Sequence, residues 1–279
     1  LPAVLEELKT GDELIIADDA STDDTKNWFD TWILDQPKFK NHEITVVFLH
    51  NPQNLRFAAT VNKASEKATN DFMLLLNNDV VPRPRLLNSL WEYWQENQNT
   101  TESENNLFAV GCLEYEQHSL SEPPTLGGKN RLWFERGMFI HSRASKLDSG
   151  ETAWASGGSA LFDLEKWKEL GGFDIAFYPA YWEDIDLSMR ARKKGWNILF
   201  CENAVVDHRH ETTNASVFGQ KKIDIMSWKN AYLFAWRHMT ATQWLQHLIW
   251  LPYHLILTAS RTKGVSLRAF FIALTQKIN

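Results

Sequence analysis

"LLLNNDVV", residues 74–81, places two asparagines and an aspartate directly after three leucines. The apolar run predicts a buried strand over 71–76, and the polar residues predict the point where that strand leaves its sheet. In an open α/β sheet, ligands bind beyond the carboxyl ends of the strands. Asp79 is therefore expected at the functional edge, where a carboxylate can bind Mg²⁺ or Mn²⁺. The alternative is that Asn77, Asn78 and Asp79 only form a turn.

Strands and helices alternate on both sides of this stretch. Short apolar strands are predicted at 13–17 and 43–50, with amphipathic helices around them. Residues 157–172 predict a strand that leads into a helix, whereas residues 107–150 are less regular. Alternation of this kind predicts the α/β class, with a mostly parallel sheet flanked by helices.

Length and charge suggest two parts. The chain has 279 residues and a formal net charge of −6, and residues 215–279 contain a single acid, Asp224, and carry +7, which leaves −13 for residues 1–214. An acidic body disfavours nucleic acid as a partner, and a basic, aromatic-rich helical extension suits an anionic membrane surface. Cys112 and Cys201 have no metal-site or disulfide spacing, which favours a reducing compartment.

Three further stretches bring polar groups to the predicted functional edge. "ADDAS" at 17–21 follows a strand, "YWEDIDL" at 181–187 begins a helix, and "VVDHRH" at 205–210 follows the last predicted strand. Each also has a simpler interpretation: the acids can cap a helix or interact with its dipole, and the histidines can lie on the surface.

Taken in order, four segments resemble the family-2 glycosyltransferases with a GT-A fold, most closely the branch that includes rhamnosyltransferases. The segments are "LIIADDASTDDT", "NPQNLRFAATVNKASEKATNDFMLLLNNDV", "ASGGSALFDLEKWKELGGFD" and "YWEDIDLSMRARKKGWNILFCENAVVDH". The resemblance covers roughly residues 1–215. It implies hexosyl or rhamnosyl transfer in cell-surface polysaccharide synthesis, such as lipopolysaccharide, from a nucleotide-diphosphate sugar to a glycan or lipid-linked acceptor.

The resemblance also assigns roles to residues. Asp79 matches the last acid of a metal-binding DXD-like motif, and His208 matches a histidine that closes around the metal or diphosphate, with His210 as the alternative. Asp184 matches the acid that deprotonates the acceptor hydroxyl, with Glu183 beside it. The candidates for donor binding are Asp18, Asp19, Asn54, Arg56, Asn62 and Asn78, and the weaker acceptor candidates are Trp154, Gly158, Tyr181 and Trp182.

The chemistry agrees with these roles. A divalent ion, Mg²⁺ or Mn²⁺, neutralises the charge that develops on a diphosphate leaving group. A positioned carboxylate removes the proton of the acceptor hydroxyl. One base without an enzymic nucleophile implies direct displacement with inversion, whereas a retaining hydrolase would need two facing carboxylates.

One departure concerns the beginning of the chain. The family usually starts with a central strand that ends in a Pro-Thr-Tyr-Asn-like sequence, and this chain starts at Leu1 without it. The resemblance therefore implies that the first strand is missing and that the chain is N-terminally truncated. One alternative function is an inactive nucleotide- or carbohydrate-binding relic, if the missing strand abolishes activity. The other is a sugar-phosphate nucleotidyltransferase, which shares a related sheet.

The extension predicts membrane contact. Its ten aromatic residues are interspersed with basic residues that would face lipid headgroups. These are Lys221, Lys222, Lys229, Arg237, Arg261, Lys263 and Arg268. The expected location is cytoplasmic and peripheral, at the inner face of the cell membrane. The alternative is an ordinary helical cap on the catalytic core.

Overall fold

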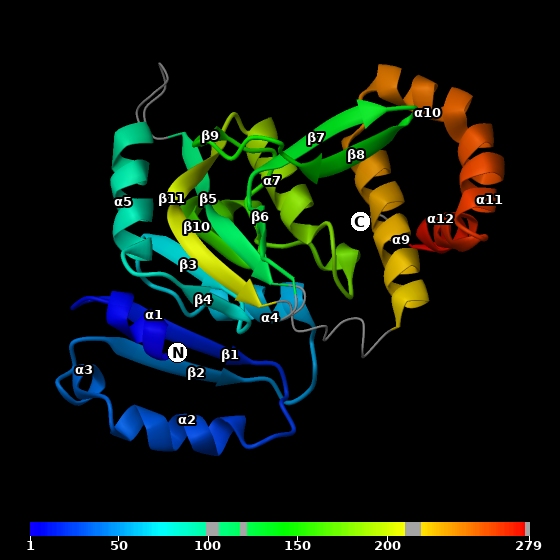
Figure 1. The fold of residues 1–279 in the computed structure, drawn as a ribbon. Helices are drawn as coiled ribbons and strands as arrows, with labels where there is room; N and C mark the ends of the chain where they lie inside the picture. Colours follow the sequence, from blue (N-terminus) through cyan, green and yellow to red (C-terminus); the bar gives the residue numbers. More distant parts are fainter. Residues whose placement is uncertain (99–105, 118–121, 210–218, 277–279) are drawn as a thin grey trace.

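The computed structural model describes residues 1–98, 106–117, 122–209 and 219–276. Along the chain, strands alternate with helices, and the chain then continues into a group of helices (Figure 1). The elements are α1 (Pro2–Glu7), β1 (Glu13–Asp18), α2 (Thr25–Leu34), α3 (Pro37–Lys40), β2 (Thr45–His50), α4 (Phe57–Ser65), β3 (Phe72–Leu76), β4 (Val80–Pro82), α5 (Leu86–Asn97), β5 (Leu107–Gln117), β6 (Thr125–Gly127), β7 (Asn130–Glu135), β8 (Met138–Arg143), β9 (Gly150–Glu151), β10 (Ser159–Asp163), α6 (Leu164–Leu170), η1 (Ile175–Phe177), α7 (Glu183–Lys193), β11 (Asn197–Arg209), α9 (Gln220–His238), α10 (Ala241–Tyr253), η2 (His254–Thr258), α11 (Ala259–Arg261) and α12 (Val265–Thr275).

The strands form one large and two small sheets. The large sheet has the order β3-β10-β5-β11-β4, with β6 paired to β5 and β9 paired to β11. The strands β1 and β2 pair with each other in parallel, and β7 and β8 form an antiparallel hairpin. This arrangement brings the end of β3 next to β10 and the end of β11 next to β4, where the predicted site residues lie.

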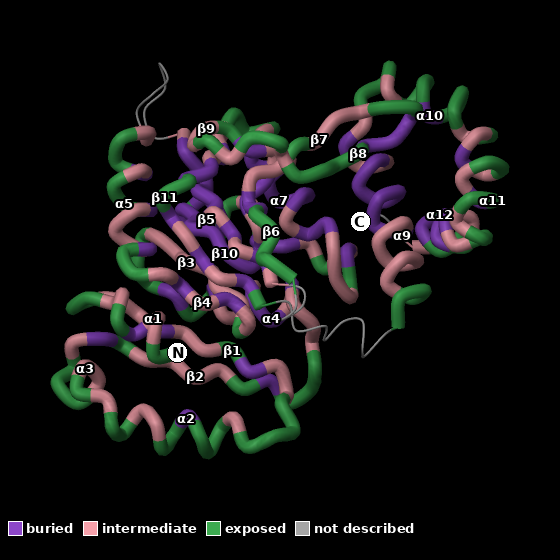
Figure 2. The backbone as a smooth tube through the Cα atoms, viewed as in Figure 1, coloured by how far each residue is buried: buried purple, intermediate pink, exposed green. Residues whose placement is uncertain are grey.

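Helices cover both faces of the large sheet. The strand β10 illustrates why, because successive side chains of a strand point to opposite faces. Phe162 packs with Trp167 of α6 in a core that also includes α4 and α7. Leu161 packs on the other face with Leu90 of α5. Burial on both faces explains why all five residues of β10 are buried (Figure 2).

The α/β class is as predicted, but the sheet is mixed rather than mostly parallel. Of the pairings among the described strands, only β1–β2 and β5–β11 are parallel. The prediction failed on direction because an apolar run has the same composition whichever way it points. It also missed the 11-residue strand β5, whose apolar pattern is interrupted by Gly111 and by Glu114 and Glu116.

The helices α9 to α12 pack against the body through the β7–β8 hairpin (Figure 1). His247 Nδ1 lies 2.7 Å from the Gly137 carbonyl oxygen, and His254 Nε2 lies 2.7 Å from that of Arg136. Gly137 has φ +75°, and a Cβ there would lie 2.8 Å from the backbone of His247, so only glycine fits this contact. The predicted boundary between residues 214 and 215 falls outside the described residues.

None of the helices within the described residues combines the length and apolar character needed to cross a bilayer.

Candidate active site

A histidine between two carboxylates lies at the edge of the large sheet. Asp79 follows β3, and its Oδ1 lies 3.5 Å from His208 Nε2, near the end of β11. His208 Nδ1 lies 3.1 Å from Glu114 Oε2 of β5, and the Ser159 hydroxyl donates a hydrogen bond to the other oxygen of Glu114. The residues predicted from 74–81 and 205–210 therefore meet, whereas His210 lies outside the described residues.

The charge state of His208 follows from its two neighbours. Burial alone would lower the pKa of this imidazole, but the hydrogen bonds and negative charges of Asp79 and Glu114 outweigh it and raise the pKa to about 10. A protonated imidazole donates from both nitrogens, which matches a carboxylate on each side. Metal coordination through Nε2 would require that this nitrogen lose its proton, while Nδ1 keeps its bond to Glu114.

Asp79 fits a divalent ion by its donor chemistry. Its Oδ1 is buried and, among the residues that the structure describes, accepts no hydrogen bond of good geometry beyond the long 3.5 Å ion pair with His208. A buried oxygen with so weak a partner is costly unless a cation or ligand satisfies it. Within the same residues no group of three or more His, Cys, Asp or Glu side chains is arranged to hold a metal. Asp79 with His208 therefore fits an ion that takes its other ligands from phosphate oxygens and water.

Asp184 lies in the first turn of α7, close to this cluster. The Gly157 N–H lies 3.4 Å from Asp184 Oδ2, and the Ile185 N–H donates to Oδ1 at 2.8 Å. Burial raises the pKa of Asp184 to about 6, and the nearby charge of Glu114 acts in the same direction. Burial and the charge of Asp184 raise the pKa of Glu183 to about 8, so at neutral pH Glu183 is protonated and Asp184 is the free base.

If Asp184 acts as the catalytic base, turnover should rise with pH through its titration. An ordinary aspartate has a pKa of about 4 and would be ionised across the range in which the protein is folded. Because the pKa of Asp184 is raised to about 6, the base is lost as pH falls below that value. We expect an ascending limb with a midpoint near 6 in a pH–rate profile at saturating donor. A rate independent of pH from 5 to 8 would contradict this assignment.

Asp18 and Asp19 lie where β1 ends and organise the adjacent loops. His50 Nδ1 lies 2.6 Å from Asp18 Oδ2, and the Leu55 N–H donates to Asp19 Oδ1 at 2.7 Å. The Arg56 N–H donates to Asp19 Oδ2 at 2.8 Å. Burial opposes ionisation of both acids, but these hydrogen bonds prevail and lower the pKa of each. Both are therefore ionised, and Asp19 fixes the loop that leads into α4.

The other donor-binding candidates differ in how their side chains are engaged. Asn54 Oδ1 accepts a bond from the backbone of Arg56 in the loop that Asp19 organises. Asn62 bonds both backbone groups of Phe173, at 2.7 and 2.8 Å, so its amide joins α4 to the segment before η1. Asn78 is exposed in the turn before Asp79.

The acceptor candidates fall into two groups. Trp154 and Trp182 are buried, with ring centroids 5.6 and 4.9 Å from that of His141. Tyr181 is half-buried and directly precedes Trp182, the N-cap of α7. Gly158 approaches Asn77 so closely that a Cβ would lie 2.8 Å from the amide nitrogen of Asn77. Gly158 therefore permits the contact between the β10 entry and the end of β3.

Glu114 is the main site residue absent from the sequence prediction. A usable signal was present, since Glu114 and Glu116 alternate with apolar residues in "LEYEQ". Residues two apart in a strand share a face. Both acids are buried, and Glu116 pairs with Arg143. Two acids on one face of an apolar strand must have partners, which points to a polar site.

Two family models match the chain. One, described as "Glycosyl transferase family 2", matches residues 1–170, and another, described as "Glycosyl transferase family group 2", matches residues 131–276. The chain is also 26% identical over 212 residues to the O-antigen chain rhamnosyltransferase WbaN of Salmonella anatum. That match covers 74% of this chain and 59% of the relative, so the chain spans little more than half the length of this curated relative.

Three solved structures have a fold similar to that of this chain. The mannosyltransferase PcManGT of Pyrobaculum calidifontis, in complex with GDP-Man and Mn²⁺, has a TM-score of 0.55 at 13% identity and covers 99% of this chain and 73% of its own. TarS 1–349 of S. aureus with UDP scores 0.55 at 14% identity, over 96% and 69%. GalNAc-T7 with UDP, GalNAc and Mn²⁺ scores 0.56 at 16% identity, over 80% and 41%. At such identities the likeness concerns the fold alone.

Proposed function

The chain belongs to glycosyl transferase family 2 and has the GT-A fold, and we propose that it is an inverting transferase. It moves a hexosyl or rhamnosyl unit from a nucleotide-diphosphate sugar to a hydroxyl of a glycan or lipid-linked acceptor, in cell-surface polysaccharide synthesis. The observation that carries the proposal is the half-buried Asp184, with a pKa raised to about 6, beside the Asp79–His208–Glu114 cluster.

Asp184 is the base in this proposal. A base works best when its pKa lies near the operating pH, because it is then ionised and still takes a proton readily. Its position in the first turn of α7 holds the carboxylate against the backbone N–H groups of Gly157 and Ile185. Glu183, protonated at neutral pH, leaves Asp184 as the single charged group of the pair.

Asp79 and His208 hold the diphosphate end of the donor. A bound Mg²⁺ or Mn²⁺ would neutralise charge on the leaving diphosphate. Asp79 presents its buried Oδ1, which has only a long 3.5 Å contact with His208 among the described residues, and Glu114 orients His208 through Nδ1. The loops organised by Asp18 and Asp19 accept the base and ribose, with Asn54, Arg56, Asn62 and Asn78 as further donor-binding candidates. Similar structures with GDP-Man, UDP and Mn²⁺ support this choice of donor class.

Release of sugar from a panel of UDP-, GDP- and dTDP-linked sugars, with Mn²⁺ and with a chelator, tests the function. We expect slow hydrolysis of one donor type that depends on the divalent ion. If nucleotide binds and no donor is cleaved, a binding relic is the correct description. Formation of a nucleotide sugar from a sugar phosphate would instead identify a nucleotidyltransferase.

We further propose that α10, η2 and α12 dock the enzyme on the inner face of the membrane. Many residues of these helices are exposed (Figure 2), and several of the exposed residues have large apolar side chains. These are Leu245, Leu248, Ile249, Ile256, Leu257, Phe271 and Leu274. The basic residues Arg261, Lys263 and Arg268 are exposed on the same group of helices, and no acid follows Asp224 in the sequence. Exposed apolar area with basic neighbours matches a bilayer with anionic headgroups.

Two basic residues of the predicted membrane surface lie elsewhere. Lys229 is buried and donates to the Tyr178 carbonyl, and Arg237 pairs with Asp174 at 2.6 Å. The prediction that they face lipid headgroups is therefore wrong. Both residues lie on the face of α9 that packs against the segment before α7. That segment supplies the acceptors, the Tyr178 carbonyl and the Asp174 carboxylate, that allow basic side chains to be buried there.

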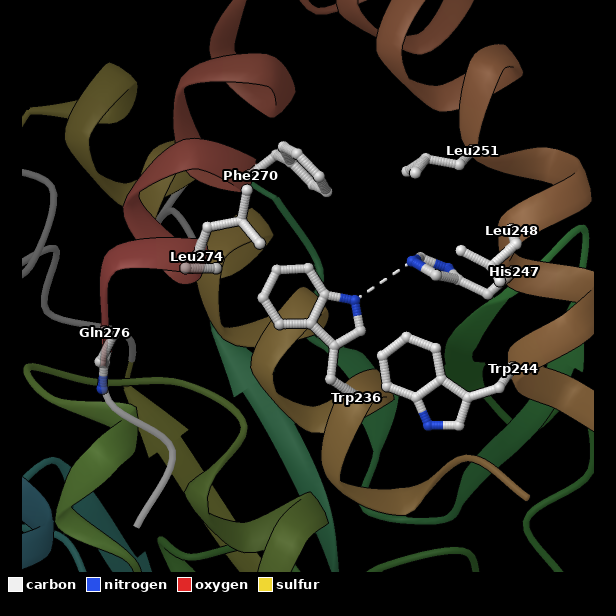
Figure 3. Close-up of a pocket in the computed structure, with 9 residues that line it drawn as sticks. Trp236, Trp244, His247, Leu248, Leu251, Phe270, Leu274 and Gln276 are labelled. Carbon is white, nitrogen blue, oxygen red and sulfur yellow. Dashed lines mark hydrogen bonds between the residues drawn. The ribbon is translucent and has the colours of Figure 1, made fainter. Parts of the chain in front are cut away.

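A cavity between α10 and α12 extends the apolar surface (Figure 3). It has a volume of about 380 Å³, and Trp236 of α9 lies between Phe270 and Leu274 on one side and Leu248 on the other. Its indole N–H donates to His247 Nε2 at 3.1 Å, and His247 uses Nδ1 to reach the Gly137 carbonyl. These ring nitrogens bond to protein partners, so the lining suits hydrocarbon rather than a polar ligand.

Vesicle co-sedimentation of Ile249→Glu tests the docking surface. Ile249 is 67% exposed on α10, and a charge there would oppose burial in lipid, so partitioning should fall by roughly tenfold or more. Leu34→Glu is the matched control, because Leu34 is 68% exposed on α2. Binding by the unchanged protein should also weaken with salt and with loss of anionic lipid. Equal binding by both variants would favour a plain helical cap.

A further inference from the structure

We propose that Asn230 of α9 positions Asp184 by holding the strained backbone directly before it. The proposal rests on the function above, in which Asp184 is the base. Asn230 lies in the C-terminal extension, 46 residues after Asp184 in sequence, and outside the segments that the sequence linked to catalysis. It contacts neither donor nor acceptor in this proposal and acts only through the backbone.

The backbone before Asp184 is strained. Tyr181 and Trp182 have φ values of 75° and 76°, in the left-handed region that residues with a side chain rarely adopt. Trp182 is the N-cap of α7, so this pair sets the direction in which the first turn of the helix leaves the loop. Two such residues in succession persist only where the surroundings determine their conformation.

Asn230 provides those surroundings. It is fully buried, and its Nδ2 lies 2.8, 2.9 and 2.8 Å from the carbonyl oxygens of Phe177, Ala180 and Tyr181. Three acceptors converge on one nitrogen, which identifies that atom as the NH₂ end of the amide. The neighbouring Lys229 holds the carbonyl of Tyr178 at 2.8 Å. The loop therefore directs its carbonyls at α9 from both sides of Pro179.

A second set of contacts fixes the helix beyond the loop. His238 Nε2 lies 2.7 Å from Oδ1 of the fully buried Asp186, and Arg190 Nε donates to Oδ2 at 2.7 Å. Trp182 packs on Phe234 of α9, with ring centroids 5.0 Å apart. The contacts of His238 and Phe234 keep α7 against α9, and Asn230 bonds the backbone carbonyl of the left-handed Tyr181. Its loss would therefore release the loop while α7 stays docked.

Asp184 depends on this backbone because its own anchors are few. The Ile185 N–H belongs to the same turn, and the Gly157 N–H is 3.4 Å away. If the Tyr181 carbonyl were released, Tyr181 and Trp182 could relax toward the right-handed region and the carboxylate would move. A displacement of about 1 Å can cost around a hundredfold in rate.

The test is Asn230→Leu, which keeps similar volume and removes the donors. We expect turnover with water as acceptor to fall by about ten- to a hundredfold, while the affinity for UDP or GDP with Mn²⁺ stays within about twofold because the donor loops are untouched. Leu90→Ala is the control, since it destabilises a fully buried part of α5 in a different hydrophobic cluster from Phe177 and Trp182 of the loop. If turnover falls equally in both variants at matched stability, the effect is general and the proposal fails.

A rescue experiment separates positioning from mere stability. Glycine adopts positive φ without strain, so Tyr181→Gly should restore part of the turnover lost in Asn230→Leu. Because water is the acceptor in this assay, removing the Tyr181 ring cannot change turnover by weakening the binding of a glycan acceptor. Strictly additive effects would overturn the proposal, and Asn230→Ala replaces the leucine variant if that does not fold. Normal turnover in Asp184→Asn would instead refute the base itself.

Discussion

Asp184→Asn should lower turnover by about 10²- to 10⁴-fold, the range typical of a lost general base. Asparagine has nearly the same shape and can still accept the Ile185 N–H through its oxygen, so α7 should keep its first turn. What it cannot do is take a proton from the acceptor hydroxyl. Nucleotide binding with Mn²⁺ should persist, because Asp79 and His208 are unchanged. Steady-state kinetics and calorimetry on the same preparation measure both quantities.

The control for this variant is Glu165→Gln in the first turn of α6. Glu165 is exposed, and like Asp184 it lies where a carboxylate interacts favourably with the helix dipole. If the role of Asp184 were only to stabilise its helix, both variants would lose a similar, small amount of stability and neither would lose turnover. Near-normal turnover in Asp184→Asn would remove it from the role of base.

The parts of the fold that could be predicted from the sequence are those in which hydrophobic residues follow a strong local pattern. The apolar runs that became β1, β2, β3 and β10 were visible because strands that pack on a core need hydrophobic residues, although of these four only β10 is buried along its whole length and β3, expected to be buried, is half-buried. The helix after β10 ends at Gly171, which adopts the left-handed cap expected of glycine. Strand direction and the pairing of β5 with β11 depend on tertiary contacts between distant residues, and no local pattern records them.

The same distinction applies to the site. Asp79 and His208 were predicted at the sheet edge, and the structure places them 3.5 Å apart there. Glu114 could have been noticed from its alternation with apolar residues, whereas Asn230 could not. An asparagine within a long helix has no local signal, and its role depends on three carbonyls some 50 residues earlier in the chain.

Asp79→Ala should abolish the Mn²⁺-dependent part of nucleotide binding while the fold survives. The substitution removes the negatively charged carboxylate oxygens that a hard cation prefers, including the buried Oδ1 whose contact with His208 is a long 3.5 Å. His208 should also lose part of its positive charge, because one of the two carboxylates that raise its pKa is gone. Calorimetric titration of UDP and GDP, each with Mn²⁺ and with a chelator, measures the metal-dependent difference.

Asp71→Ala provides the matched control for Asp79→Ala. Asp71 is an exposed aspartate directly before β3, and Asp79 follows the same strand. Each substitution therefore removes one negative charge near an end of β3. The control should retain the full gain in nucleotide affinity on adding Mn²⁺. Metal-dependent affinity that is unchanged in Asp79→Ala would show that the ion, if required, binds elsewhere. An equal loss in both variants would mean that net charge, and not the oxygen of Asp79, governs binding.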